Sequence, residues 1–483
     1  MEELSGLDAS FLYLESAKMP MHIGQIAIIE GTITFADFKA YFEQRLHLVE
    51  RLRQKLVFVP LDIDRPYWVQ DPNFDLNMHL FSAALPQPGN WKELRYFASQ
   101  EFSKQLSRER PLWEFIFVEG VDGIPQIPKG SIALLCKLHH AAFDGKAGLE
   151  LTSMLFNFST ESRPVTASPS KFIEPTPGWL KLVSKGLANI VLRPAKLPGL
   201  LWETGKATLK ASYLNQIHDI EVPTLPFSAP LTRLNNSVDV ERKWDTAILD
   251  LARLKVIQKS VQGATINDVV LAICAGALRR YLMEKNDLPD ESLVAMVPVS
   301  IRAKEQQKNA VGNQVSAMFI QLETNTEKAL DRLQQIHINT LIGKLYQDGV
   351  VANKLMAYAE LVPYGLAGIA TKLYSLGILS KRIKPPFNLI ITNVPGPQKQ
   401  LYLAGHKLIY TMGTGPICDG AGLIIPVLSY NGSLTISPTS CEKLMPDIEV
   451  FCRYIRESAN ELELAALEKI EADTKLSTTN KKS

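Results

Sequence analysis

The 483-residue sequence lacks the features that mark several large classes of protein. Its five cysteines are an odd number, lie far apart and include no C-x-x-C pair. This spacing argues against a disulfide framework or a zinc ribbon and favours a reducing compartment. Neither sign of charge dominates, because 52 Lys and Arg residues face 50 Asp and Glu residues. No global field therefore attracts nucleic acid, and we expect no nucleic-acid partner.

Targeting and membrane-spanning signals are also weak. The first twenty residues begin acidic and lack the basic region of a signal peptide. The most apolar window, Met356–Ser380, is interrupted by Glu360, Pro363 and Lys372, whereas a spanning helix needs about 20 nearly uncharged apolar residues. The window predicts either a buried or half-buried helical pair or an element that touches lipid at an interface. We therefore expect a cytoplasmic protein.

Three common catalytic and nucleotide-binding motifs are missing. No G-x-S-x-G run is present, which argues against an α/β-hydrolase. The sequence also contains no G-x-x-x-x-G-K-[ST] phosphate loop and no G-x-G-x-x-G run that opens a helix. These absences disfavour nucleoside triphosphate hydrolysis and dinucleotide chemistry.

The composition that is present is that of a globular protein, with 46% hydrophobic and 21% charged residues. Residues 1–160 alternate between helical and strand-like patterns, which predicts a mixed α/β half. The expected strands are 23–29, 115–119 and 132–139, and the expected helices are 35–54, 90–106 and 146–158.

Residues 161–238 differ from what precedes them, because prolines cluster there and break regular structure. We interpret this stretch as a crossover between two halves. Its segment 179–206 is both basic and apolar and predicts a partly helical element that suits a membrane surface. The alternative is that its apolar face packs on the two halves. The residues concerned are Trp179, Leu180, Leu182, Val183, Leu187 and Trp202, with interleaved Lys181, Lys185 and Lys196.

A second mixed half is expected over residues 239–472, followed by a disordered polar tail at 473–483. Thr265 is the expected N-cap of a long helix that runs through Arg280. The other expected elements are helices 249–262 and 448–464 and strands 293–299, 314–322, 389–392, 422–429 and 433–437.

The strongest chemical signal is the run His139-His140-Ala141-Ala142-Phe143-Asp144-Gly145. Adjacent residues of a strand face opposite sides, so only one of the two histidines can point into a given cavity. His140 would sit at the strand end, and an imidazole pKa of about 6.5 suits a general base. A structural histidine is the alternative. A metal site is disfavoured, because His140 and Asp144 supply two ligands where at least three are needed.

This run matches the HHxxxDG motif of CoA-dependent acyltransferases, and four further matches narrow the resemblance. The sequence is similar to bacterial wax ester synthase/diacylglycerol acyltransferases from about Leu4 to Leu464. The further matches are Leu7-Asp8-Ala9-Ser10-Phe11 with Pro20-Met21-His22-Ile23-Gly24, Arg110-Pro111-Leu112-Trp113-Glu114, Asn267-Asp268, and Asn393-Val394-Pro395-Gly396-Pro397. The sequence departs from the family pattern at Gly422-Leu423-Ile424-Ile425 and at Ile436-Ser437.

The resemblance implies two halves, each like chloramphenicol acetyltransferase, with a tunnel between them. Acyl-CoA would enter one mouth, and a long-chain alcohol or diacylglycerol the other. His140 would act as general base, without a covalent intermediate, cofactor or metal. Because the acceptors are lipids, the family also implies attachment to a membrane or to lipid inclusions. A condensation-type domain that uses carrier-bound thioesters and a non-catalytic lipid-binding relative remain alternatives.

The remaining site residues have supporting roles in this hypothesis. His139 and Gly145 belong to the motif. Asn267 is the candidate for oxyanion stabilisation or substrate orientation, whereas Asp268 either shares that role or stabilises the helix dipole. The resemblance implies that Asp144 forms a structural ion pair with an arginine, for which Arg302 is the candidate.

Overall fold

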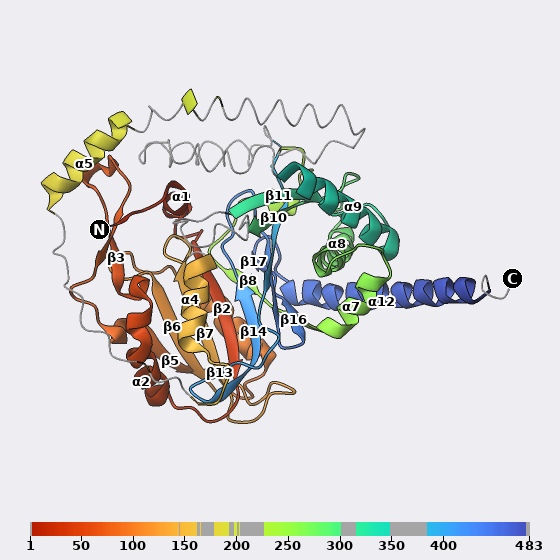
Figure 1. Cartoon of the computed structure of the whole chain (residues 1–483), viewed down its shortest axis with the longest axis horizontal. Coiled ribbons are helices and arrows are strands. Elements are labelled where there is room, and N and C mark those ends of the chain that lie inside the picture. Colours follow the sequence, from red (N-terminus) through yellow and green to blue (C-terminus); the bar gives the residue numbers. More distant parts are fainter. Residues whose placement is uncertain are drawn as a thin grey trace.

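The computed structural model describes residues 2–143, 145–161, 165, 178–192, 198–199, 202, 227–300, 315–347 and 384–479. Two large sheets lie side by side, each covered by helices (Figure 1). The predicted mixed α/β class with two halves is thus confirmed, while the tunnel stays a prediction. The window 356–380 lies outside the described residues. Within them, no helix combines the length and apolar character needed to cross a membrane.

The first sheet has six strands in the order β13-β14-β2-β7-β6-β5. Helices α1, α2 and α4 pack against one face and α3 against the other. The strands are β2 (His22–Ile29), β5 (Leu80–Ala84), β6 (Trp113–Glu119), β7 (Ile132–His139), β13 (Tyr402–Leu403) and β14 (His406–Thr414), and the helices are α1 (Gly6–Leu14), α2 (Phe35–Arg45), α3 (Trp91–Ser103) and α4 (Gly145–Leu155).

Burial on both faces explains the sequence of the central strands. Along β2, Ile26 and Ile28 join the core under α3, whereas Ala27 and Ile29 join the core under α1 and α2. Every residue of β7 is buried. A strand covered on both sides has no solvent face and needs no polar alternation.

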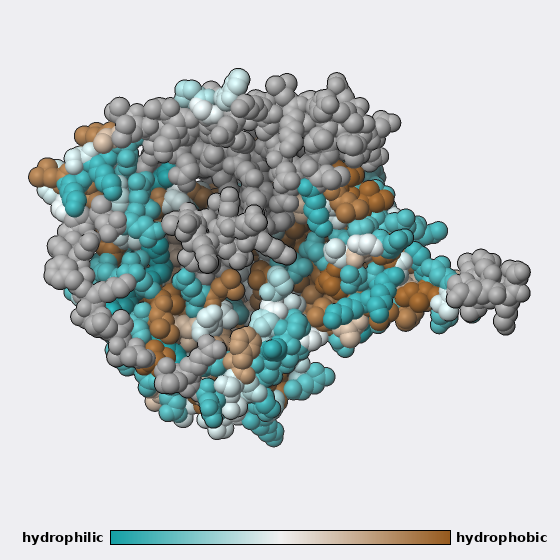
Figure 2. All heavy atoms as spheres, viewed as in Figure 1, coloured by the Kyte–Doolittle hydropathy of each residue, from teal (hydrophilic) through white to brown (hydrophobic). Residues whose placement is uncertain are grey.

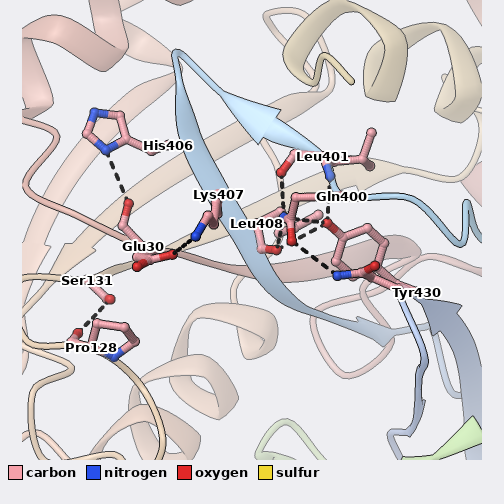
Figure 3. A network of polar contacts seen from close by, with 10 residues as sticks. Glu30, Pro128, Ser131, Gln400, Leu401, His406, Lys407, Leu408 and Tyr430 are labelled. Carbon is pink, nitrogen blue, oxygen red and sulfur yellow. Dashed lines mark hydrogen bonds and ion pairs between the residues drawn. The ribbon is translucent and has the colours of Figure 1, made fainter. Parts of the chain in front are cut away.

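Two strands of this sheet, β13 and β14, come from the second half of the chain. Residues 408–414 of β14 pair antiparallel with residues 24–29 of β2. Figure 3 shows the contacts at this crossing, where Lys407 Nζ lies 3.6 Å from Glu30 Oε2 and Tyr430 Oη donates to the Leu408 carbonyl at 3.1 Å. The predicted division at residues 160 and 238 therefore separates strands that share a sheet.

The second sheet has eight strands, of which β11-β10-β12-β15-β16-β9 form the main path and β17 joins β15 to β8. One large core lies between this sheet and its helices. The strands are β8 (Arg242–Trp244), β9 (Ala247–Asp250), β10 (Val294–Ser300), β11 (Val315–Gln321), β12 (Leu389–Pro395), β15 (Ile424–Tyr430), β16 (Ser433–Ile436) and β17 (Thr439–Cys441), and the helices are α7 (Leu251–Lys259), α8 (Ile266–Glu284), α9 (Ala329–Gln347) and α12 (Ile448–Thr479).

A third, small sheet has the order β1-β4-β3 and carries helix α5. Leu182 of α5 packs there against Val59 and Tyr67. The elements are β1 (Glu2–Glu3), β3 (Gln54–Val57), β4 (Tyr67–Gln70), the short 3-10 helix η3 (Pro60–Asp62) between the last two, and α5 (Trp179–Leu192).

Two expected helices differ in length from the structure. Helix α2 stops at Arg45, and two 3-10 turns follow where the helix was predicted to continue to residue 54. The apolar residues Leu46, Val49 and Leu52 are spaced by three, which fits a 3-10 turn as well as an α-helix. Helix α12 runs past its expected end at Leu464 into the predicted tail, because its Ala, Glu and Lys residues are strong helix formers.

One histidine of β2 is a core residue. His22 is 4% exposed, packs near Phe102 and lies opposite His139 in the strand register. Burial lowers the pKa of His22 well below its usual 6.5, and the positive charges of Lys137 and Arg242 lower it further. His22 is thus a packed core residue, and its ring is neutral in the folded protein.

Close packing of β2 against β14 yields the first prediction. A Cβ at Gly24 would lie 2.4 Å from Thr414 Cγ2 and 2.5 Å from Phe102 Cε1. We expect Gly24→Ala to destabilise the fold by about 1–3 kcal/mol, the usual result of overpacking a core. The matched control is Gly148→Ala in helix α4, where nothing lies within 4 Å of the new Cβ. Thermal unfolding should show a lower Tm for the first variant alone, and equal Tm values would contradict this packing.

The neutral His22 yields a prediction about pH. The unfolded chain binds a proton at His22 near pH 6.5, whereas the folded protein does so only at lower pH, so stability falls as the pH drops below about 6.5. Between pH 7.5 and 5.5, one such group accounts for up to about 1.4 kcal/mol. We expect His22→Gln to lose less stability than the wild type over this interval in urea unfolding. An identical loss would show that His22 does not contribute.

Candidate active site

The two histidines of the motif occupy different environments at the end of β7. His139 is the last residue of the strand and is fully buried. His140 follows it, is half-buried, and donates its backbone N–H to the Met21 carbonyl at 2.9 Å. The chain then turns, because the N–H groups of Ala142 and Phe143 both bond to the His139 carbonyl. The two rings therefore lie in different surroundings.

The ring of His140 is held by stacking. The ring of Phe11, from helix α1, lies parallel to it with an interplanar angle of 11° and a centroid separation of 3.9 Å. The contact therefore fixes the orientation of the imidazole ring at the end of β7.

The tautomer of His139 follows from its contacts. Its Nδ1 accepts the Ala141 N–H at 3.1 Å, so the proton of the neutral ring resides on Nε2. Nε2 lies 3.2 Å from Oε1 of Glu15. The ring of His139 thus connects the turn after His140 to a carboxylate on the neighbouring segment.

Glu15 is the charged centre of this arrangement. Its side chain is 1% exposed and accepts a hydrogen bond from Arg108 Nε at 2.8 Å. Burial by itself raises the pKa of the Glu15 carboxyl, but the nearby His139 ring and the charge and hydrogen bonds of Arg108 outweigh this effect and lower the pKa overall. Glu15 is therefore ionised at neutral pH.

Two motifs of the second half meet at the start of α8. Asn393, on β12, donates its Nδ2 to Oδ1 of Asn267 at 3.3 Å, and both residues are half-buried. This bond turns the donor end of the Asn267 amide away from Asn393. Asn267 is thus able to offer an N–H to another acceptor.

Asp268 is fully buried and its oxygens have several partners. Thr265 is the N-cap of α8, as predicted, and its N–H bonds to Oδ2 of Asp268 at 2.8 Å. The Thr340 hydroxyl donates to Oδ1 at 2.7 Å, and His337 Nδ1 lies 2.9 Å from Oδ2. These contacts assign Asp268 to the capping box and to the packing of α9 on α8.

The remaining predicted residues are only partly described. Gly145 begins helix α4. Asp144 and Arg302 lie outside the described residues, so their ion pair stays a prediction. Trp113 is fully buried and donates its Nε1 to the Leu52 carbonyl at 2.8 Å, so it is a packing residue. Among the described residues, no cluster of His, Cys, Asp or Glu could hold a metal ion.

The partners of the histidine pair could not be predicted from the sequence motifs. Glu15 and Arg108 lie outside the quoted motifs, and Phe11 was noted only as part of one. The available signal was the spacing of Phe11 and Glu15, since residues four apart share a helix face. Nothing in the sequence connects that face to His139.

Comparison with known proteins places this site in a family. Residues 4–270 match the wax ester synthase/diacylglycerol acyltransferase catalytic domain, and residues 311–463 match the C-terminal domain of the same enzymes. The O-acyltransferase WSD of Acinetobacter baylyi is 31% identical, over 95% of this chain and 96% of that protein. A Mycobacterium tuberculosis protein that carries the name diacylglycerol O-acyltransferase is 33% identical, over 93% and 87%.

Solved structures agree with these matches. The wax ester synthase/diacylglycerol acyltransferase from Marinobacter aquaeolei VT8 is similar with a TM-score of 0.67 and 26% identity, over 96% of this chain and all of that one. The starter condensation domain of rhizomide synthetase shares the fold, with a TM-score of 0.55 and 14% identity over 96% and 94%. With both family domains matched in order and the His-His turn at the end of β7, the chain belongs to the wax ester synthase/diacylglycerol acyltransferase family.

Proposed function

We propose that this protein transfers a fatty acyl group from acyl-CoA to the hydroxyl of a long-chain alcohol or of diacylglycerol, which produces a wax ester or triacylglycerol. The observation that carries the proposal is the half-buried ring of His140, stacked on Phe11 at the end of β7. Membership of the family supports the choice of donor and acceptor.

In this mechanism His140 removes the proton from the acceptor hydroxyl while the oxygen attacks the thioester carbonyl carbon. A tetrahedral intermediate forms with negative charge on the former carbonyl oxygen. Its collapse breaks the carbon–sulfur bond, and the proton held by His140 passes to the departing CoA thiolate. The ester and CoA are the products, and His140 returns to its neutral state. No residue is acylated.

Asn267 is our candidate for the oxyanion donor. Its acceptor atom is engaged by Asn393, which leaves the amide N–H groups directed elsewhere. Asp268, by contrast, has its carboxylate engaged by Thr265, Thr340 and His337. An amide donor aimed at a developing oxyanion in a water-poor site is an effective form of transition-state stabilisation.

A lipid surface is the partner that the acceptors require, and α5 suits it. Trp179, Leu180 and Leu187 of α5 are 64%, 65% and 56% exposed, and hydrophobic side chains are visible over this helix in Figure 2. From the sequence, Leu182 was expected to be part of this surface. In the structure it faces the other way and packs in the small core. Lys196 lies outside the described residues.

The neighbouring turn η3 enlarges this apolar surface. Asn189 of α5 donates to Asp64 at 2.8 Å, and Gly186 packs closely on Ile63. At the tip of the same turn, Leu61 is 93% exposed and has a φ of 61°. A leucine in the left-handed backbone region is strained, and exposing its apolar side chain to water is unfavourable. We propose that η3 and α5 rest together on the cytoplasmic face of a membrane or on a lipid inclusion.

Substitution of each histidine tests the mechanism. We expect His140→Ala to lower kcat by about 10²–10⁴-fold, the usual contribution of a general base, while the protein remains folded. His139→Ala should cost less, since that ring does not face the substrates. The assay follows thiol release from palmitoyl-CoA with hexadecanol or diacylglycerol as acceptor. Equal losses for the two variants would contradict the assignment, and thiol release that needs a carrier-bound thioester would favour a condensation domain.

Vesicle binding tests the surface. We expect binding to anionic vesicles that weakens with salt and in the Lys181→Glu/Lys185→Glu variant, because basic residues beside an apolar helix face are attracted to anionic lipid. The control is Lys92→Glu/Lys255→Glu, which changes the net charge equally at exposed sites on α3 and α7. Sedimentation with vesicles measures the effect. Absence of binding at low salt, or equal weakening in both variants, would reject the proposal.

A further inference from the structure

A single turn at the end of α1 contacts both histidines of the site. Phe11 stacks on the ring of His140, and the carboxylate of Glu15 lies against the ring of His139. Glu15 is the C-cap of the helix, and its N–H bonds to the Phe11 carbonyl at 3.1 Å. The two side chains are thus held at a fixed helical spacing, four residues apart.

The Glu15 carboxylate is buried for a reason other than packing. An apolar residue of similar volume would often be equally stable or more so in such a place. Arg108 balances its charge and also donates to the Leu12 carbonyl at 2.9 Å, which ties the cation to the same helix. A buried, neutralised carboxylate of this kind provides directed acceptor atoms at a defined point.

Two routes lead from Glu15 to the backbone on both sides of the catalytic ring. In the first, His139 Nε2 faces Oε1 of Glu15, while Nδ1 of the same ring accepts the Ala141 N–H at 3.1 Å. In the second, the Met21 N–H donates to Oε1 at 3.3 Å, and the Met21 carbonyl accepts the His140 N–H at 2.9 Å. The backbone of residues 140 and 141 is therefore connected to Glu15 twice.

We propose that Glu15 is a positioning residue of the acyl transfer, which acts through His139 and Met21 to hold the His140 ring where it can accept a proton. The proposal rests on the proposed function. It gives the first histidine of the motif a role although its ring is fully buried. His139 acts as a strut between the Glu15 carboxylate, 3.2 Å from its Nε2, and the Ala141 N–H, which sets the tautomer of the neutral ring.

The first test is Glu15→Gln, which keeps the shape of the side chain. One end of the amide must present N–H groups either to His139 or to Arg108, so one contact is lost. We expect kcat to fall by about ten- to a hundredfold, as for small displacements of a catalytic group. KM for palmitoyl-CoA should change less than about threefold, because a loss confined to the transition state leaves KM unchanged.

The matched control for this variant is Glu114→Gln. Glu114 lies on β6, is also mostly buried, and faces the cations Lys137 and Arg110, but it contacts neither histidine. A general effect of removing a buried charge would lower kcat in both variants. The proposal requires that only Glu15→Gln does so.

A pair of substitutions at His139 keeps the proposal testable if Glu15→Gln does not fold. Gln at position 139 can present an N–H toward Glu15, whereas Asn can only accept the Ala141 N–H near the position of Nδ1. We expect His139→Gln to retain the higher kcat. In the His139→Asn background, Glu15→Gln should lower kcat less than it does in the wild type, because the contact between residue 139 and Glu15 is already lost. Equal kcat values for the pair, or an undiminished effect in the double variant, would overturn the proposal.

A spectroscopic readout separates this proposal from the proposed function. Selective ¹⁵N labelling of the eight histidines reports which ring nitrogen carries the proton. We expect one ring in the Nε2–H form, assigned to His139 by its disappearance in His139→Asn and shifted in Glu15→Gln. If neither the wild type nor any variant turns over palmitoyl-CoA with hexadecanol or diacylglycerol, the proposed function is wrong. The spectra would then still test whether Glu15 controls the His139 ring. A His139 ring protonated at Nδ1, or one unaffected by Glu15→Gln, would overturn the role of Glu15.

Discussion

Strand β2 lies inside the first sheet, so the backbone groups along both of its edges need hydrogen-bond partners. On the edge away from β7, the partner strand β14 comes from the other half of the chain. Strand β14 supplies these bonds along residues 24–29. Buried backbone groups without partners are costly, so β2 could not remain an interior strand without β14. Strand β14 also contacts the second sheet, since the Thr435 hydroxyl of β16 donates to the carbonyl of Thr411 in β14 at 2.9 Å. One strand therefore ties both sheets together.

This pairing determines the position of the turn that carries His140. The other edge of β2 pairs with β7, so that His22 lies opposite His139. Met21, immediately before β2, receives the His140 N–H. The location of β2 thus sets the location of His140, and β14 sets the location of β2. Because β14 of the second half is part of the sheet of the first half, neither half can shift without moving the site.

Several secondary-structure elements around the site could be predicted from local sequence. The apolar run 132–139 predicted β7 with its observed ends, and Thr265 with Asp268 three residues later predicted the start of α8. Both are short-range signals, because a strand and a capping box depend on neighbouring residues alone. The motif that begins at His139 was found for the same reason. Helix α2 was predicted too long where a spacing of three fits two kinds of helix.

Local sequence identified the candidate residues, whereas the way these side chains are held depends on contacts between distant segments. The pairing of β14 with β2 joins segments almost 400 residues apart, and no local pattern reports such a pairing. The same holds for the meeting of Asn267 with Asn393, and for the contact of Glu15 with His139. A buried charge resembles a surface charge in the sequence. Only folding removes its water and makes its partners matter.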